Sequence, residues 1–240
     1  MFKEFGQGVG FLSFHKYEAW GTWLTDQEGY YSNEELLKKA GGEDTDPQVY
    51  TPQEMQQIWY RARGQLLPII CSETNLNSAY KNGTDPRIQQ IIGAVWYAEE
   101  LRTFVQKGLT YSIYYHFASD DSPEWNSTKL TQGWGFGMVK ETSPFTEWYS
   151  YLVNYLVGNY LEAGDEFYEA SSDKPDFVSV MAWRAKNNYL RVILLCKNPN
   201  ATAVNIKVMP QDFVTYKIDK TNNNIVISNN RNQSFWMDIP

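Results

Sequence analysis

The chain has 240 residues, with 21 basic and 28 acidic side chains, so its formal net charge is −7. Hydrophobic residues make up 42% of it and charged residues 20%, and it holds 9 Trp, 17 Tyr and 12 Phe. This composition excludes a disordered chain, a collagen-like chain and a coiled coil. The acidic balance argues against nucleic-acid and membrane partners, and no apolar run is long enough to span a bilayer.

Strand-like runs alternate with helical periodicity in the first part of the chain. The run Val9–Tyr17 has the period-2 alternation of a strand. A helix is predicted from Thr51, with Pro in its first turn and Gly64 at its end. The next run, Leu66–Glu73, is apolar and ends in polar residues, which is typical of a parallel strand covered on both faces.

Two further helices and a third strand follow. A strongly periodic helix is predicted from Asp85-Pro86 to Gly108, and Leu109–Phe117 is predicted to be a strand. Another helix is expected from Ser143-Pro144 to about Val157. Three strand–helix units in succession imply parallel strands with right-handed crossovers.

From Leu161 onward the pattern changes to short β-rich runs separated by turn residues. Such runs predict a small β-sandwich. We therefore expect an α/β domain over residues 1–160 and an all-β domain over residues 161–240.

Polar residues stand at the end of each of the three predicted parallel strands, where chemistry gathers in such sheets and barrels. The strand ends are His15-Lys-Tyr17, Ser72-Glu-Thr-Asn75 and Tyr114-Tyr-His116. Alternation predicts one face that points into a barrel and one that packs on helices. The inward set is Glu73, Cys71, His15, Tyr17, Tyr114 and His116. The outward set is Leu12, Phe14, Tyr111 and Ile113.

Glu73 is the candidate catalytic residue. A Glu at a strand end can also be a surface residue or the partner of a nearby cation. The apolar run before it, and the tyrosine and histidines expected around it, favour the functional interpretation. His15 and His116 are the only histidines, and each alone could be a hydrogen-bonded barrel-core residue. With Glu73 they could form a metal face, but no metal-binding spacing supports it, so we predict no metal and no cofactor.

The segment Ser72-Glu73-Thr74-Asn75 after an apolar strand resembles the nucleophile strand of clan A glycoside hydrolases. The resemblance is closest to the xylosidase, arabinofuranosidase and endoglucanase branches, which append a β-sandwich to a (β/α)8 barrel. Phe11–Tyr17 is similar to their sixth strand, and Leu109–Phe117 would be the eighth. The resemblance implies that residues 1–160 are the C-terminal part of a TIM barrel, about strands six to eight, and that residues 161–240 are the appended sandwich.

The resemblance also implies roles for individual residues. Glu73 matches the nucleophile of a retaining glycosidase, and Tyr17 matches the tyrosine that hydrogen-bonds this carboxylate and favours its charged form. His15 would line the subsite of the cleaved sugar, and Asn75 would steady the strand end or bind a sugar hydroxyl. Tyr114 completes the substrate-binding set expected at the strand ends.

Two further aromatic positions belong to the expected substrate site. His116 stands where these enzymes often have a tryptophan platform. Trp134, in the Gly-rich loop Gly133–Gly137, is the candidate stacking platform, because an exposed indole suits the apolar face of a pyranose. The alternative for Trp134 is packing between the barrel and the sandwich.

A retaining glycosidase needs a second carboxylic acid, about 5–5.5 Å from the nucleophile. In the resembling family this acid is a Glu that follows an Asn, and the only such pair here, Asn33-Glu34, begins a predicted helix. A complete barrel takes about 250 residues. We therefore expect this chain to be the C-terminal half of an enzyme. An open sheet edge must be covered, so we expect a separate polypeptide to complete the barrel. The alternative is that the chain is a processed or truncated part of a longer one.

The leading hypothesis is a glycosidase that cleaves β-linked polysaccharide, such as cellulose or xylan, with that partner polypeptide present. The alternatives are a non-catalytic carbohydrate-binding or scaffold subunit, and a metal-dependent barrel hydrolase. Cys71 and Cys196 are expected to be buried free thiols. No signal peptide is predicted at the start, but an extracellular location is expected from four N-x-[ST] sequons, at Asn82, Asn126, Asn200 and Asn232.

Overall fold

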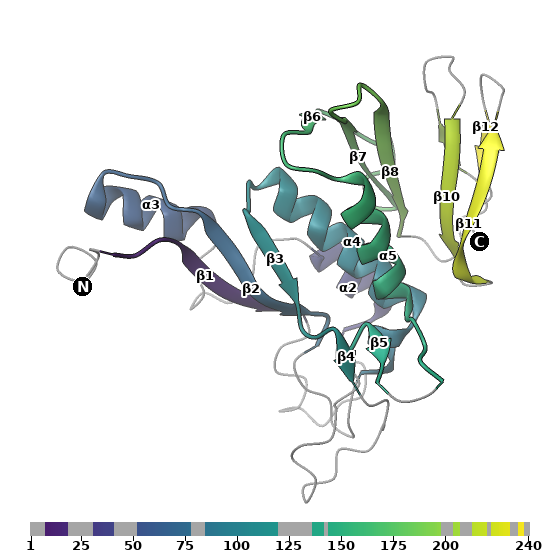
Figure 1. Ribbon diagram of the computed structural model, residues 1–240, viewed down its shortest axis with the longest axis horizontal. Coiled ribbons are helices and arrows are strands. Elements are labelled where there is room, and N and C mark those ends of the chain that lie inside the picture. Colours follow the sequence, from purple (N-terminus) through teal and green to yellow (C-terminus); the bar gives the residue numbers. More distant parts are fainter. Residues whose placement is uncertain are drawn as a thin grey trace, which may run out of the picture.

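The computed structural model describes residues 8–18, 31–40, 52–77, 85–119, 136–141, 144–197, 204–206, 213–219, 222–230 and 235–237. Figure 1 shows a parallel sheet towards the N-terminus, a group of helices beside it, and small antiparallel sheets towards the C-terminus. No helix in these ranges is both long enough and apolar enough to cross a membrane.

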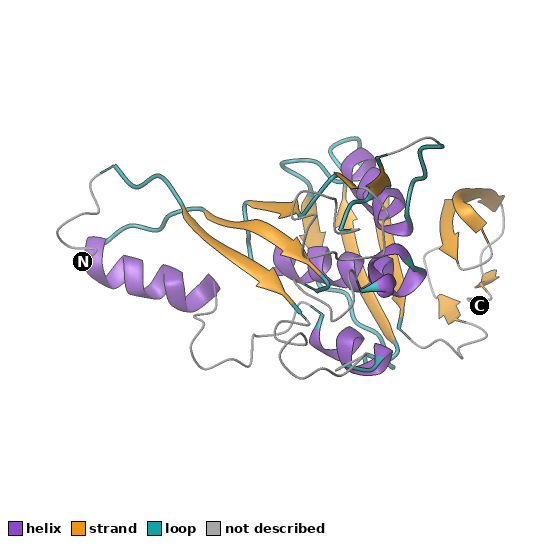
Figure 2. Ribbon diagram, turned by 90° about the horizontal axis from the view of Figure 1, so that it is seen from below, coloured by secondary structure: helices purple, strands orange, loops and turns teal. Residues whose placement is uncertain are grey.

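The three predicted parallel strands are present and pair with one another. They are β1 (Leu12–Tyr17), β2 (Ile69–Asn75) and β3 (Tyr111–Tyr114), in the order β1-β2-β3 with both pairings parallel. Helix α3 (Pro52–Arg63) precedes β2, and helix α4 (Ile91–Gln106) connects β2 to β3. Figures 1 and 2 show α3 at the N-terminal end of the sheet, apart from the other helices. The predicted strand–helix alternation is confirmed for this region.

The helix predicted from Asp85 is divided into two. Asp85 accepts a hydrogen bond from the backbone N–H of Arg87 at 3.1 Å and caps a short 3-10 helix, η2 (Pro86–Gln89). Helix α4 starts only after Gln90. A side chain at Gly93 would meet the carbonyl oxygen of Arg87 at 2.3 Å, so glycine allows η2 to pack directly on the first turn of α4.

The helix predicted from Ser143-Pro144 also begins later. Helix α5 (Tyr149–Tyr160) follows Trp148, whose N–H donates to the carbonyl of Met138 at 2.9 Å. Just before it, the carbonyl of Thr146 accepts from the N–H of Lys140 at 2.8 Å. These bonds hold the segment in an extended conformation beside β5 (Val139–Lys140), which itself pairs in parallel with β4 (Ala118–Ser119). Backbone groups used in this way cannot continue a helix.

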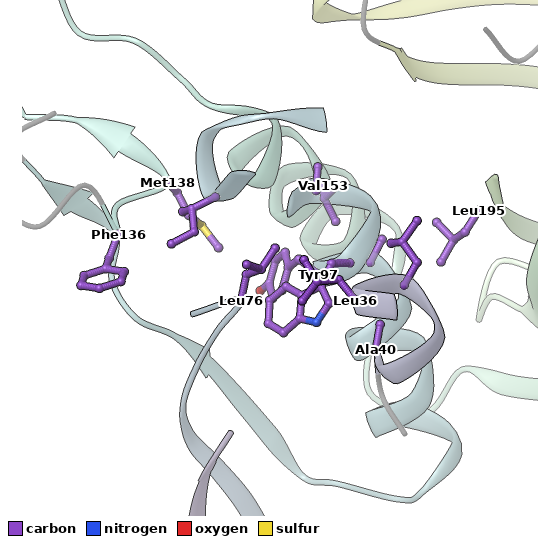
Figure 3. Packing of buried hydrophobic residues seen from close by; sticks show 13 residues of the cluster. Leu36, Ala40, Leu76, Tyr97, Phe136, Met138, Val153 and Leu195 are labelled. Atoms are coloured by element: carbon purple, nitrogen blue, oxygen red, sulfur yellow. The ribbon is translucent and has the colours of Figure 1, made fainter. Parts of the chain in front are cut away.

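A hydrophobic cluster of buried residues lies among the helices (Figure 3). Its fully buried members include Trp96 of α4 and Leu36 of α2 (Asn33–Lys39). Helix α2 begins with the expected capping box, in which Ser32 and Glu35 each bond the other's backbone N–H, at 2.7 and 3.2 Å. The Asn33-Glu34 pair is therefore the start of a helix, as predicted.

Every β-rich run predicted after residue 160 forms a strand. The first sheet is antiparallel and holds β6 (Glu166–Tyr168), β7 (Val178–Arg184) and β8 (Leu190–Cys196). Two further antiparallel pairs are β9 (Val204–Ile206) with β12 (Phe235–Met237), and β10 (Phe213–Asp219) with β11 (Asn222–Asn230). In the described ranges these are three separate sheets, so a two-sheet sandwich and the domain boundary stay predictions.

The β6-β7-β8 sheet is tied to α4 through a buried carboxylate. Glu99 accepts a hydrogen bond from Ser179 of β7 at 2.8 Å and pairs with Arg102 at 2.8 Å. Lys197, directly after β8, lies 3.6 Å from the same carboxylate. A buried charge must be paired, and these partners join the C-terminal sheet to the helix that covers the parallel sheet.

Candidate active site

Glu73 lies near the carboxyl end of the central strand β2, and its two oxygens have different partners. The Tyr17 hydroxyl donates a hydrogen bond to Oε1 of Glu73. His15 Nδ1 lies 3.1 Å from Oε2, and the His15 and Glu73 side chains are 59% and 25% exposed. The strand β1 therefore supplies a phenol and an imidazole to one carboxylate that can still be reached from solvent.

A bulge in β2 determines which side chains face this site. Phe14 pairs with Cys71, but the next residue of β1, His15, pairs with Glu73. The same extra residue appears against β3, between Cys71 and Thr74. A bulge of this kind changes the alternation of faces after it. Residues before and after the bulge in β2 can therefore share the helix-facing side while Glu73 points away from it.

The prediction that Cys71 and Glu73 share a face is wrong for this reason. Cys71 is fully buried. This burial is the main cause, and the negative charge of Glu100 the second, of a rise in the pKa of its thiol to about 12. Thr74 also faces α4 and donates a hydrogen bond to Glu100 at 2.7 Å. Both cysteines are free thiols; Cys71 is buried as expected, whereas Cys196 is partly exposed.

The electrostatics of the site keep Tyr17 protonated. Burial, the hydrogen bond to Glu73 and the charge of that carboxylate all raise the pKa of Tyr17 above its usual value, in that order of importance. A neutral phenol is a donor to a carboxylate and stabilises its charged form. Tyr17 is therefore a hydrogen-bond donor to Glu73 throughout the neutral pH range.

Asn75 and Tyr114, both predicted to bind substrate, make internal contacts in the structure. The Asn75 amide is fully buried and donates to the carbonyls of Tyr115 and Phe136, the latter at 3.1 Å. Its oxygen accepts from the Tyr114 hydroxyl at 3.3 Å. The Tyr114 ring packs edge-on against Tyr97 of α4, with 4.8 Å between centroids, and burial raises the pKa of its phenol. Of the two roles expected for Asn75, steadying the strand end is the one these contacts describe.

Tyr115 is the site neighbour that the sequence analysis missed. It is 43% exposed, and it lies close enough to Tyr17 to contribute to the raised pKa of that phenol. Its ring meets the His116 ring edge-on, with 4.9 Å between centroids, and a cis peptide bond joins these two residues. The sequence analysis applied the alternation along β3 with the opposite phase, because it placed Ile113, which shares a face with Tyr115, on the helix-facing side.

The expected outward set is divided between the two faces of the sheet. Phe14 does pack on a helix, edge-on against Phe104 of α4 with 6.1 Å between ring centroids. Tyr111 and Ile113 do not, because they point away from α4 and are 63% and 55% exposed. Trp134 lies outside the described residues.

Within the described ranges, no group of three or more His, Cys, Asp and Glu side chains could hold a metal ion. Glu34, the Glu of the Asn-Glu pair, has a side chain that is 75% exposed on α2 and pairs with Lys38 at 2.7 Å. The site therefore offers one carboxylate with the Tyr17 hydroxyl and the His15 imidazole beside its two oxygens, and Glu34 has the contacts of a helix-surface residue.

Solved structures that share this fold are glycoside hydrolases. A bifunctional glucanase-xylanase from a metagenome library matches with a TM-score of 0.57 at 15% identity, over 97% of this chain and 42% of that one. An arabinofuranosidase from Xanthomonas axonopodis pv. citri matches with a TM-score of 0.64 at 12% identity, over 100% and 52%. The catalytic domain of xylanase C from Talaromyces cellulolyticus matches with a TM-score of 0.56 at 14% identity, over 98% and 61%.

No protein-family model and no curated protein matches the sequence, so the similarity is one of fold alone. The chain spans about half the length of the structures that it matches. The described elements therefore have the fold of part of a TIM-barrel glycoside hydrolase.

Proposed function

We propose that this chain carries the nucleophile of a retaining glycoside hydrolase that cleaves β-linked polysaccharide. The single observation that supports this most strongly is the environment of Glu73, with Tyr17 on one oxygen and His15 on the other. A carboxylate at the carboxyl end of a parallel strand, reachable from solvent and held by a donor, has what a nucleophile at a sugar carbon needs.

In the proposed reaction Glu73 attacks the anomeric carbon while the bond from that carbon to the leaving oxygen breaks. The leaving oxygen takes a proton from a second carboxylic acid, and water then hydrolyses the glycosyl ester with that acid acting as base. Tyr17 and His15 hold the Glu73 carboxylate in one orientation during both steps. We propose that a partner polypeptide supplies the second acid.

The names of the matching structures support a substrate of the cellulose or xylan type. They include a glucanase-xylanase, an endoglucanase and a xylanase, alongside arabinofuranosidases. A panel of soluble β-glucan, xylan and arabinose-substituted xylan separates these possibilities. We also propose an extracellular location, because cellulose and xylan are too large to enter cells and are found outside them.

The test is Glu73→Gln in the assembly that hydrolyses polysaccharide. The amide has the same shape but cannot form a glycosyl ester, so we expect kcat to fall by about 1,000-fold or more. Glu73→Gly with added azide should recover activity, because a small anion can enter the space of the lost carboxylate. Glu34→Gln is the matched control, since Glu34 is exposed on α2.

A Glu73→Gln variant with wild-type turnover would contradict the proposal. It would favour the non-catalytic scaffold, in which a partner performs the chemistry and this chain binds carbohydrate. Loss of activity on treatment with a chelator, with no effect of Glu73→Gln, would instead favour a metal-dependent hydrolase.

A further inference from the structure

We propose that Glu100 of α4 is a positioning residue for Glu73, and that it acts through its hydrogen bond with Thr74, the next residue of β2. This inference rests on the proposed function, because it explains how the chain holds the nucleophile in place. By "open face" we mean the side of the parallel sheet opposite α4, which carries Glu73, Tyr111 and Ile113. Glu100 is fully buried on the α4 side, so it influences Glu73 through the strand between them.

Glu73 lies in the part of β2 whose pairing is irregular. The register of β2 shifts against β1 and also against β3, in both cases between Cys71 and Thr74. Pairing with β3 resumes at Thr74, which lies opposite Tyr114. A bulge bends a strand and can change the direction of a side chain. The orientation of Glu73 therefore depends on what fixes the strand directly after the bulge.

Thr74 is fixed from three directions. Its carbonyl accepts a hydrogen bond from the N–H of Tyr115 at 2.9 Å, and Lys16 of β1 lies opposite it in the sheet. Its hydroxyl donates to Oε1 of Glu100 at 2.7 Å. Thr74 and Glu100 are both fully buried, and a hydrogen bond is electrostatically stronger where the local dielectric is low. The side-chain bond thus ties β2 to α4 at the first regular residue after the bulge.

Glu100 also lies close to the other end of the bulge. Its negative charge contributes to the raised pKa of the Cys71 thiol. That thiol in turn donates to the backbone carbonyl of Glu73, with 3.4 Å between sulfur and oxygen. The buried carboxylate is therefore near both residues that flank Ser72 and Glu73 on the α4 side. The backbone of the bulge is held from behind, while the Glu73 side chain remains on the open face.

The proposed reaction needs this support. A misplacement of a reacting group by about 1 Å can cost about 100-fold in rate, and groups that fix a site often stand behind the residues that touch the substrate. Tyr17 and His15 constrain the two carboxylate oxygens of Glu73 from β1. Glu100 constrains the backbone that carries this carboxylate from the opposite side of the sheet.

The neighbouring residue Glu99 provides an internal comparison. It is also buried on α4 and accepts a hydrogen bond from the Ser179 hydroxyl at 2.8 Å. Ser179 is buried as well, but it belongs to β7 of the C-terminal sheet. Two consecutive carboxylates thus each accept from a buried hydroxyl, and one of these hydroxyls is next to Glu73. A positioning role predicts that the two hydrogen bonds have different effects on the reaction.

The experiment measures the reactivity of Glu73 in the assembly that hydrolyses polysaccharide. The probes are two deoxyfluoro glycosides, one of xylobiose and one of cellobiose, each with a dinitrophenyl leaving group. Glu73 forms a bond to the anomeric carbon as dinitrophenolate leaves, and this leaving group needs no acid. The fluorine slows hydrolysis of the glycosyl ester, so the labelled enzyme accumulates. Peptide mass spectrometry locates the label.

Thr74→Val and Thr74→Ser separate the hydrogen bond from the shape of the side chain. Valine keeps the shape of threonine without the hydroxyl, so we expect the maximal rate constant of labelling to fall by about 10- to 100-fold. Serine keeps the donor, so its rate constant should stay within about threefold of wild type. In polysaccharide hydrolysis by Thr74→Val, kcat should fall more than KM changes. Thr74→Ala removes the same donor without added bulk and serves if Thr74→Val does not fold.

Ser179→Ala is the matched control, because it removes a buried hydroxyl from the neighbouring carboxylate. Both Ser179→Ala and Thr74→Val should lower the urea midpoint, since each removes a buried hydrogen bond. Ser179→Ala should nevertheless be labelled at the wild-type rate. The rate constant is measured on the molecules that become labelled, so a smaller folded fraction does not change it.

The outcomes separate this inference from the proposed function. Wild-type enzyme labelled at Glu73, with an equal rate constant for Thr74→Val, would support the proposed function and overturn the positioning role. Equal losses in Thr74→Val and Ser179→Ala, or in Thr74→Val and Thr74→Ser, would also overturn it. A wild-type enzyme that hydrolyses polysaccharide but carries the label on another residue, or is labelled by neither probe, would instead overturn the proposed function.

Discussion

The two faces of the parallel sheet are built from the same three strands but have opposite environments. The face towards α4 is buried and carries internal hydrogen bonds: Thr74 donates to Glu100, and Tyr114 packs on Tyr97 and donates to Asn75. The other face leaves Tyr111 and Ile113 exposed. Within the described residues α4 packs on one face of the sheet, and the candidate site lies on the opposite face.

The carboxylates on the two sides differ in the same way. Glu99 is held by a serine, an arginine and a lysine and joins α4 to the C-terminal sheet. Glu73 has a phenol and an imidazole as partners and remains partly exposed. Glu99 thus joins two parts of the fold, whereas the carboxylate of Glu73 can be reached from solvent.

The largest effect on stability is expected from the buried side of this comparison. Trp96 is fully buried in the cluster between the helices. Trp96→Ala should lower the free energy of unfolding by about 3–5 kcal/mol, because it removes a large buried side chain and leaves a cavity. Urea denaturation followed by circular dichroism measures this. A loss below about 1 kcal/mol would show that the helices do not pack as described.

Tyr17→Phe tests the hydrogen bond on the open side. It removes the donor to Glu73 while keeping the ring, so we expect kcat to fall by about 10- to 100-fold, as for the loss of a hydrogen bond to a charged group. KM should change less than kcat. Steady-state kinetics of the assembled enzyme measure both, with the exposed Tyr189→Phe as control. Equal kinetics for the two variants would remove Tyr17 from the site.

The pH dependence of stability tests whether the bulge in β2 buries the Cys71 thiol against α4. Its pKa is raised to about 12 by burial and by Glu100, so the folded chain keeps the thiol proton at a pH where the unfolded chain has lost it. Stability should therefore fall as pH rises from about 9 towards 12, by up to about 1.4 kcal/mol per pH unit from this group. The urea midpoint of Cys71→Ala should fall less steeply over this interval. Parallel slopes for both proteins would place Cys71 in a more solvated environment.

The smallest effect is expected on the open face. Ile113→Ser removes an apolar side chain that is already 55% exposed, so the free energy of unfolding of the isolated chain should change by about 0.5 kcal/mol or less. The same urea titration measures this change, and Trp96→Ala is the comparison. A loss of several kcal/mol would mean that the isolated chain already covers this face.

The sequence predicted the elements better than their ends. Periodicity located all three parallel strands, α3, and every strand after residue 160. It placed the start of α5 at Ser143-Pro144, which is too early. The later start depends on the backbone bonds from Trp148 to Met138 and from Lys140 to Thr146, which join segments that no local sequence pattern connects. The split of η2 from α4 likewise depends on close packing at Gly93.

The pattern of apolar and polar residues was enough to predict that His15, Tyr17 and Glu73 meet at one end of a parallel sheet. Carboxyl ends of parallel strands meet at one edge whatever the details of packing. Only the tertiary structure decided which neighbours join them. An extra residue in β2 turns Cys71 towards α4 while Glu73 stays on the open face, and β3 contributes Tyr115 to that face, not Tyr114. A bulge is a property of pairing between strands, and no single strand's sequence specifies it.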